Sequence, residues 1–233
     1  RRKTMWAKLN SDKDTIEEII VNPKIMTVDG ITHPRTLFSL WTDAERKAIG
    51  IVPVTTSGTS LDSKYYIEQD ESFAIAGDKN SVVRTIGQKA ADKNLADVNE
   101  VWTQSEIDDG QAPGGTSAND PKLDDDGNQI VTKGLKTLAK QKADVDANSL
   151  CQGFNWLIQR KVTADTAIPS AVVTYMAAVR TAHASICTAI DNASDIDAFK
   201  VLHTTEYNED GSVKTIAKVE DWPDDSGVEG YRR

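Results

Sequence analysis

The chain has 233 residues and a formal net charge of -9 at pH 7, and hydrophobic residues make up 39% and aromatic residues 6% of it. A chain of this length can bury a real core, which here must be built mainly from aliphatic side chains. Its acidic balance argues against nucleic acid and anionic membranes as partners, because both carry negative charge that repels an acidic surface.

The first region, residues 5–103, is predicted to be β-rich and to contain two parts, 5–54 and 61–103. Two apolar segments flank the polar cluster Asn10–Asp14 and predict a hairpin over residues 6–20. The region is therefore expected to hold small hairpins rather than long helices.

A second hairpin and a compact helix are expected next. The pair Asp29–Gly30 is typical of a tight hairpin turn. Thr42 and Glu45 have the spacing of a capping box at a helix start, and Gly50 can end that helix. Pro53 in the following strand predicts an edge strand or the end of a strand, because proline cannot donate a ladder hydrogen bond.

Residues typical of turns and loops divide the middle of the chain. Residues 55–60 are expected to form a flexible joint, and a hairpin with its turn at 77–80 is predicted within 61–87. Residues 90–95 are expected to be helical. A stretch rich in glycine, proline and aspartate, residues 104–132, predicts an acidic flexible linker.

Residues 133–202 carry the clearest helical periodicity and predict a helical hairpin with a third short helix. The first helix is expected over Lys133–Val162, although Gly153 lowers helix stability by about 1 kcal/mol. The second begins at Pro169, a good first-turn residue. The third is expected over Ser194–Val201 with Ser194 as its cap.

The predicted fold class is α+β, with a small β-hairpin-rich N-terminal part, an acidic Gly/Pro linker and a C-terminal helical hairpin. Residues 203–233 are expected to add one hairpin and a loose tail. The apolar stripe of the first helix is thin before Leu150. This part is therefore expected to contact a partner chain or to stay partly exposed.

No signal peptide and no membrane span are predicted, since no apolar run approaches about 20 residues. Met5 resembles a natural start, so residues 1–4 are expected to be an upstream remnant.

The acidic loop at residues 124–130 partly matches the pattern of a calcium-binding loop. Aligning Gly127 with the invariant glycine of a calcium loop puts Asp124 and Asp126 at ligand positions. It also puts Lys122 and Lys133 where carboxylates are required. A solvated acidic turn is therefore expected, and no metal site is predicted.

The remaining chemistry-bearing residues do not form a catalytic motif. His183 and Cys187 have a spacing that could place both on one metal, but two ligands make half a site. Cys151 and Cys187 are expected to be buried free thiols. No nucleophile elbow, phosphate-binding loop or dinucleotide fingerprint is present. No catalytic residue, cofactor or enzyme activity is predicted.

Two tryptophans are candidates for interfaces. Trp102 and Trp222 lie in polar surroundings, unlike the tryptophans of the patterned elements. Aromatic side chains are enriched at protein–protein interfaces. Both are therefore candidates for contact with a partner, beside the alternative that they pack within the chain.

Two stretches carry a family resemblance. The first contains Trp41-Thr42-Asp43-Ala44-Glu45-Arg46 and then Gly50-Ile51-Val52-Pro53-Val54. The second pairs Trp156 and Arg160 before a turn with Tyr175 and Arg180 after it. Together they resemble small tail-associated proteins of tailed bacteriophages, including tail-fibre assembly proteins and virion structural proteins of marine and cyanobacterial phages. The acidic stretch at 104–132 and the hairpin tail depart from that pattern.

The resemblance implies a non-enzymatic virion structural protein of the tail or tail-fibre region, assembled in the host cytoplasm and retained in the virion. It implies attachment to other phage tail or fibre proteins in a symmetric multi-copy assembly, with Trp156, Arg160, Tyr175 and Arg180 as further interface candidates. One alternative is a tail-fibre assembly chaperone that leaves the particle. Another is a glycan-active hydrolase that uses Asp124 and Asp126 as its carboxylate pair.

Overall fold

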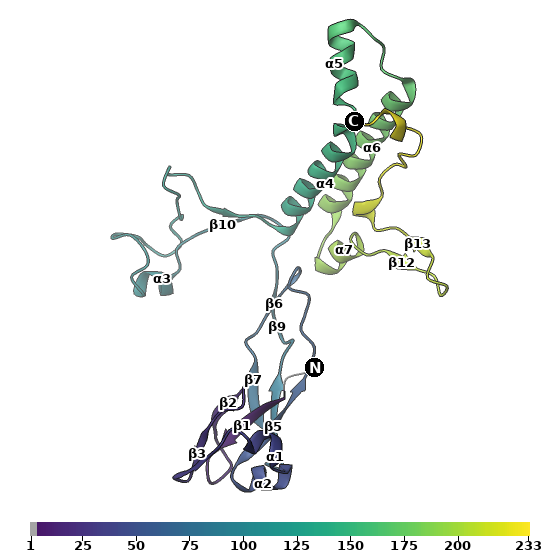
Figure 1. The fold of residues 1–233 in the computed structure, drawn as a ribbon. Coiled ribbons are helices and arrows are strands. Elements are labelled where there is room, and N and C mark those ends of the chain that lie inside the picture. The colour runs from purple at the N-terminus through teal and green to yellow at the C-terminus, as the bar shows by residue number, and fades with distance from the viewer. Residues whose placement is uncertain (1–3) are drawn as a thin grey trace. The chain divides into compact units, whose positions relative to one another are not determined.

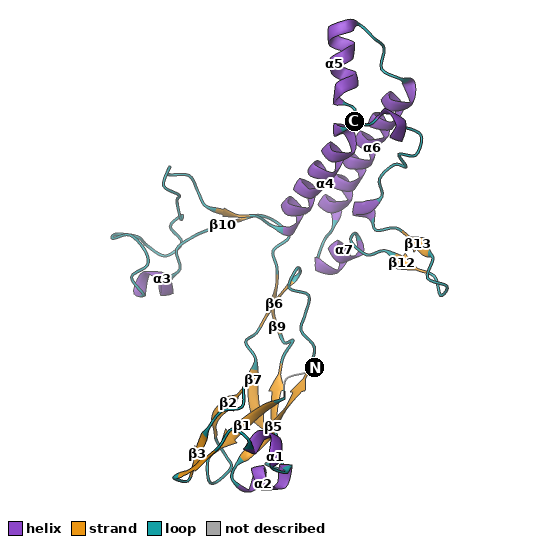
Figure 2. Cartoon of the chain, viewed as in Figure 1, coloured by secondary structure: helices purple, strands orange, loops and turns teal. Residues whose placement is uncertain are grey.

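The computed structural model describes residues 4–233, which form two compact units that meet between Asp92 and Lys93. Unit 1 is the part up to Asp92, and unit 2 runs from Lys93 to Arg233. The fold is α+β, with the main sheet in unit 1 and the long helices in unit 2 (Figure 2). The boundary between the two units lies earlier in the chain than the expected boundary at 103/104. The reason is that the strand Val98–Asn99 pairs with the strand Val131–Thr132, which belongs to unit 2.

The elements of unit 1 are β1 (Met5–Leu9), β2 (Ile16–Ile20), β3 (Met26–Val28), β4 (Ile31–His33), α1 (Leu37–Leu40), α2 (Asp43–Ala48), β5 (Ile51–Ser57), β6 (Tyr66–Glu68), β7 (Ser72–Ile75), β8 (Val82–Thr85) and β9 (Lys89–Asp92). The elements of unit 2 are β10 (Val98–Asn99), α3 (Gln104–Asp108), β11 (Val131–Thr132), α4 (Leu135–Gln152), α5 (Asn155–Ala164), α6 (Ser170–Asn192), α7 (Ile196–Val201), β12 (Glu206–Tyr207), β13 (Val213–Thr215), η1 (Lys218–Glu220) and η2 (Glu229–Tyr231).

Unit 1 is built on a five-stranded sheet with strand order β2-β1-β5-β8-β7 (Figure 1). Side chains alternate between its two faces. Trp6 and Ile51 join the cluster that includes Leu37 of α1, whereas Ala7 and Val52 belong to a second cluster. The core of unit 1 therefore lies along the central strands.

Several local predictions for unit 1 are confirmed. β1 and β2 pair as the expected antiparallel hairpin, and β3 and β4 pair around Asp29–Gly30. The Thr42–Glu45 capping box is present at the start of α2. Gly50 has the left-handed φ of 75° that ends this helix. Each of these features depends on residues that are close together in the sequence, so the sequence alone predicts it.

Three predictions that depend on distant pairing were wrong. β5 is the central strand rather than an edge, and it continues through the expected joint to Ser57. Pro53 is tolerated there because β8 begins to pair with β5 only at Val54. The segment expected to be helical at 90–95 instead contributes to β9, which pairs with β6.

In unit 2, α4 and α6 pack along each other, and the predicted first helix is interrupted. α4 ends at Gln152, and α5 begins at Asn155. A Cβ on Gly153 would lie 3.2 Å from the Cγ of Arg232. Because glycine has no side chain, the C-terminal segment can pack closely against the break between α4 and α5. The cap of α7 also differs, because the side chain of Asp195, not Ser194, accepts from Ala198 N.

The C-terminal segment, residues 217–233, includes the stretch around Trp222 that was predicted to be a loose tail, but it is packed on the helices. Val228 is buried and belongs to the same apolar cluster as Phe154. The Trp156 indole N–H donates to Tyr231 O at 2.9 Å, and Arg233 N donates to Gly153 O at 3.2 Å. Distant contacts therefore order a segment whose local sequence is polar.

Within residues 4–233, no helix has the length and apolar character needed to cross a membrane.

Candidate functional site: docking surfaces

The N-terminus of α4 is joined by hydrogen bonds to the start of a long projecting segment, residues 93–133, here called the arm. Leu135 N and Lys136 N donate to the carbonyl oxygens of Asn94 and Leu95, both at 3.0 Å. These contacts satisfy helix N–H groups that would otherwise lack partners. Asp97 accepts from Gly134 N at 2.8 Å, and its hydrogen bonds with Thr137 and Gly134 lower the pKa of its carboxyl group.

The arm, which includes the predicted linker at 104–132, is held by its own backbone hydrogen bonds. β10 pairs with β11, and isolated bridges join Val101 to Pro121 and Leu123 to Gln129. A capping box formed by Thr103 and Glu106 begins α3. This stretch was predicted to be a flexible linker; in the structure these contacts fold its glycine-rich and proline-rich part back on itself.

The arm has no core of its own, since none of residues 93–133 is buried. Five large aliphatic side chains on it are between 37% and 52% exposed, namely Val98, Val101, Leu123, Ile130 and Val131. It also carries nine Asp or Glu residues against three Lys residues, a net charge of -6. A two-stranded ribbon without a core is marginally stable in water. The arm therefore has the physical character of a segment that docks on something else.

Acidification is expected to loosen α3, because Glu106 holds two parts of the arm together. Its carboxylate accepts from Lys122 Nζ at 2.6 Å and from Thr103 N at 2.9 Å. These contacts, with the Lys122 bond the largest cause, lower the pKa of Glu106 from 4.5 to about 2. A lowered folded-state pKa contributes stability that is complete above pH 4.5 and is lost as the pH falls toward 2.

Amide NMR signals of residues 103–106 should report this loosening between those pH values. In a Glu106→Gln variant, the NMR signals of α3 should show the same loosening of the helix already at neutral pH. Signals that stay unchanged down to pH 2 in the native chain would contradict the role assigned to Glu106.

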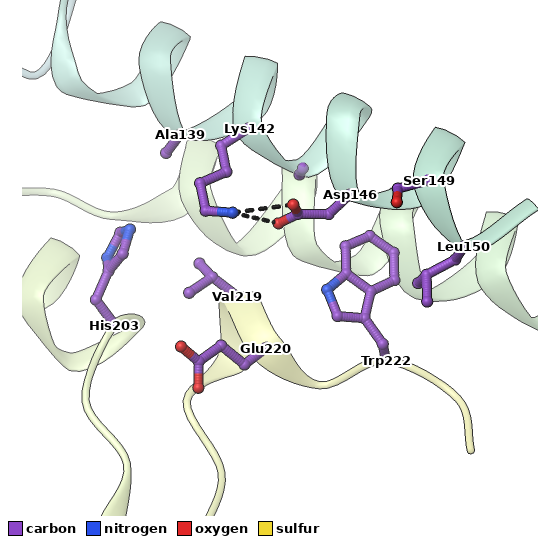
Figure 3. Close-up of a pocket in the computed structure, with 10 residues that line it drawn as sticks. Ala139, Lys142, Asp146, Ser149, Leu150, His203, Val219, Glu220 and Trp222 are labelled. Carbon is purple, nitrogen blue, oxygen red and sulfur yellow. Dashed lines mark hydrogen bonds and ion pairs between the residues drawn. The ribbon is translucent and has the colours of Figure 1, made fainter. Parts of the chain in front are cut away.

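A second surface is a cavity of about 390 Å³ beside α4 (Figure 3). Its apolar walls come from Ala139, Ala143 and Leu150 of α4 and from Val219 and Trp222 of the C-terminal segment. Its polar lining includes Lys142, Asp146 and Glu220. Part of the half of α4 that has a thin apolar stripe therefore lines an opening next to the chain's own C-terminal segment.

The interface candidates from the second resemblance motif are separated by the structure. Trp156 and Arg160 lie together, and the Arg160 and Arg233 guanidinium carbons are 4.9 Å and 4.0 Å from the Trp156 ring centroid. Tyr175 is only 5% exposed, so its ring is part of the core. Arg180 is exposed on α6.

The two tryptophan candidates lie on the two surfaces already described. Trp102 is half-buried on the arm, where Lys122 Nζ is 4.8 Å from its ring centroid. Trp222 is half-buried beside the cavity next to α4.

His183 and Cys187 lie beside a third polar group, but the arrangement does not suit nucleophilic catalysis. The same nitrogen of His183, Nε2, is 2.7 Å from Asp144 Oδ1 and 3.5 Å from Cys187 Sγ. A relay from nucleophile to base to orienting carboxylate uses the two different ring nitrogens. Burial, followed by the charge of Asp144, raises the pKa of the Cys187 thiol and disfavours the thiolate.

Both cysteines are free and half-buried. Across the described part of the chain, no three His, Cys, Asp or Glu side chains are arranged to hold a metal ion.

The carboxylate pair considered for glycan hydrolysis has a structural role in its loop. Asp124 Oδ1 accepts from Asn128 N at 2.8 Å and from Asp126 N at 3.0 Å. These contacts, with the Asn128 N–H the largest cause, lower the pKa of Asp124. A glycosidase acid needs a raised pKa so that it stays protonated.

Sequence reasoning missed the apolar side chains of the arm and the carboxylate of Glu220. A signal for the arm was present, since Val98 and Val101 precede the glycine-rich run and Ile130 and Val131 follow it. Glu220 gave no signal, because its position depends on how the C-terminal segment packs.

Comparison of the chain with protein-family models, curated proteins and solved structures finds no match.

Proposed function

We propose that the chain is a non-enzymatic attachment protein of a multi-copy assembly and that the arm docks on a neighbouring protein. The observation that carries this proposal is an arm with ordered backbone pairing, five exposed large aliphatic side chains and no buried residue. The resemblance of the Trp41–Val54 and Trp156–Arg180 stretches points to the tail or tail-fibre region of a tailed bacteriophage. In this proposal, the hairpin of α4 and α6 anchors the arm at the N-terminus of α4.

The energetics of docking support this role. Each exposed aliphatic side chain of the arm still has roughly half of its burial to gain, which is worth about 1 kcal/mol per side chain. The five together would contribute about 5 kcal/mol before the costs of association. Because the backbone is already paired, less ordering is required when the arm docks.

Charge indicates the kind of neighbour. A net charge of -6 on the arm favours a partner surface that carries lysine or arginine around an apolar centre. It disfavours contact between the arms of two copies, because like charges facing each other repel. The arm therefore fits a different protein of the assembly better than another arm.

The test is the composition of purified phage particles. The chain should be present in virions analysed by gel and mass spectrometry. A variant with Val101→Ser, Leu123→Ser and Ile130→Ser should be retained about a hundredfold less, because three docking contacts of about 1 kcal/mol each are lost. The control is Val162→Ser, which alters an equally apolar side chain that is 79% exposed on α5.

Absence of the native chain from particles would contradict a virion role. If the chain co-purified transiently with a fibre and was absent from finished particles, the alternative would be supported, namely a tail-fibre assembly chaperone. Equal retention of the triple variant and the native chain would contradict docking through the arm.

A further inference from the structure

We propose that the cavity beside α4 is a recognition site for a cationic side chain, arginine above all, carried on an apolar segment of another protein. This site is distinct from the arm and does not depend on the function proposed for it. The inference rests on Trp222, Glu220 and the way two other tryptophans of the chain, Trp6 and Trp102, are paired.

Two of the four other tryptophans, Trp6 and Trp102, have a cationic partner that is itself paired with a carboxylate. The Arg46 guanidinium carbon lies 4.3 Å from the Trp6 ring centroid, and Arg46 pairs with Asp43. Lys122 Nζ lies 4.8 Å from the Trp102 ring centroid and pairs with Glu106. Such stacking of a cation on an indole, combined with a carboxylate, is a favourable arrangement.

Trp222 has a carboxylate beside the same cavity but no cation of this chain. Within residues 4–233, no lysine or arginine lies over its ring, and the Glu220 side chain makes no hydrogen bond or ion pair. Figure 3 shows the indole of Trp222 and the side chain of Glu220 on the same segment at the cavity, with the Glu220 carboxylate extending toward the His203 side. An aromatic ring and an unpaired carboxylate therefore line one cavity with no lysine or arginine between them in the described residues.

The one lysine at the cavity is already occupied. Lys142 Nζ lies 2.9 Å and 2.8 Å from the two carboxylate oxygens of Asp146, so these two charges offset each other. Of the two carboxylates that line this opening, Glu220 is then the one without an ion pair. Unit 2 adds a favourable field, since it has 23 Asp or Glu residues against 14 Lys or Arg, whereas unit 1 is balanced.

The apolar rim explains why the cation should come on a polypeptide segment. Leu138 lies one helical turn before Lys142, and Val145 lies three residues after it, so both border the same side of α4. They are 48% and 65% exposed. An incoming arginine could place its guanidinium between Trp222 and Glu220 while flanking apolar residues cover this rim. A cavity of about 390 Å³ is within the range of small ligand sites.

The experiment uses the full chain labelled with ¹⁵N and two capped tripeptides, acetyl-Leu-Arg-Leu-amide and its citrulline analogue, which is uncharged. The indole N–H signal of Trp222, assigned from a Trp222→Phe spectrum, is followed during each titration. The arginine peptide should shift this signal saturably and bind about fivefold more tightly than the citrulline peptide.

Glu220→Gln should remove that preference and leave the Trp222 signal in place. Glu209→Gln is the matched control, because it removes one exposed carboxylate from the turn between β12 and β13. Equal affinity for the two peptides, no shift with either, or an unchanged preference in Glu220→Gln would each overturn the proposal. None of these outcomes bears on retention of the chain in particles, so this test and that of the arm can fail separately.

Discussion

Replacing Phe154 with alanine is expected to lower the free energy of unfolding of unit 2 by about 3–5 kcal/mol. Phe154 is 0% exposed, and its ring lies edge-on to Tyr175 with centroids 5.8 Å apart. Removing the ring leaves a cavity at the break between α4 and α5. It also removes the aromatic surface beneath Arg232, whose guanidinium carbon is 5.3 Å from the Phe154 centroid. The C-terminal segment should therefore loosen together with the core.

Hydrogen exchange read by mass spectrometry during urea unfolding distinguishes the two units. Peptides of α4, α6 and residues 217–233 should lose protection in the Phe154→Ala variant, and those of the unit 1 sheet should keep theirs. Val162→Ala is the control on α5, where a surface change should stay within about 0.5 kcal/mol. A loss below about 1 kcal/mol for Phe154→Ala would show that Phe154 does not hold the cluster together.

The parts of the fold that the sequence predicts well are those with local causes. A capping box needs only Thr42 and Glu45, and a tight hairpin needs only Asp29–Gly30. Both contacts close within a few residues, so no distant segment can override them. The sequence also predicts that strands dominate the first half of the chain and helices the second, because these patterns too repeat within a few residues.

The parts that could not be predicted depend on segments far apart in the sequence. The C-terminal segment is too polar to suggest packing, yet Arg232 lies against Gly153 and pairs with Asp225 at 2.8 Å. Pro53 suggested an edge strand, but the central strand β5 tolerates this proline because β8 pairs with β5 only from Val54 onward. Periodicity carries no information about such partners.

The candidate docking residues show the same division. Trp102 and Trp222 were identified from their polar surroundings, and both are half-buried beside exposed surfaces. Tyr175 was expected at an interface because of its motif, but its spacing on α6 places it in the core with Phe154. A motif specifies which residue type stands at a position, whereas the exposure of that residue depends on which other segments of the chain cover it.

Replacing Gly134 with alanine is expected to detach the arm from α4 and to cost about 3 kcal/mol. A Cβ at this position would overlap the backbone of Ala96 and lie 2.5 Å from Leu95 O. Neither atom belongs to a flexible side chain, so the two backbones must move apart. The hydrogen bonds from Leu135 N and Lys136 N to Asn94 O and Leu95 O would then be lost.

The matched control for this change is Gly114→Ala, because a Cβ on Gly114 meets nothing within 4 Å. In the Gly134→Ala variant, amide exchange at Leu135 and Lys136 should quicken by about a hundredfold, which corresponds to the loss of roughly 3 kcal/mol of protection. The control should leave these amides unchanged. Protection that stays within about threefold of the native value would show that the arm is not fixed at this junction.

The functional consequence separates anchoring of the arm from its docking contacts. Gly134→Ala leaves every exposed side chain of the arm in place but frees the base of the arm to reorient. An arm with a mobile base must be ordered when it docks, which weakens association without the loss of any contact. Gly134→Ala should therefore reduce retention in particles, as the triple serine variant does, while the arm's own pairing of β10 with β11 persists in NMR spectra. Full retention of this variant would mean that the arm docks as an independent segment and that its anchorage to α4 serves stability alone.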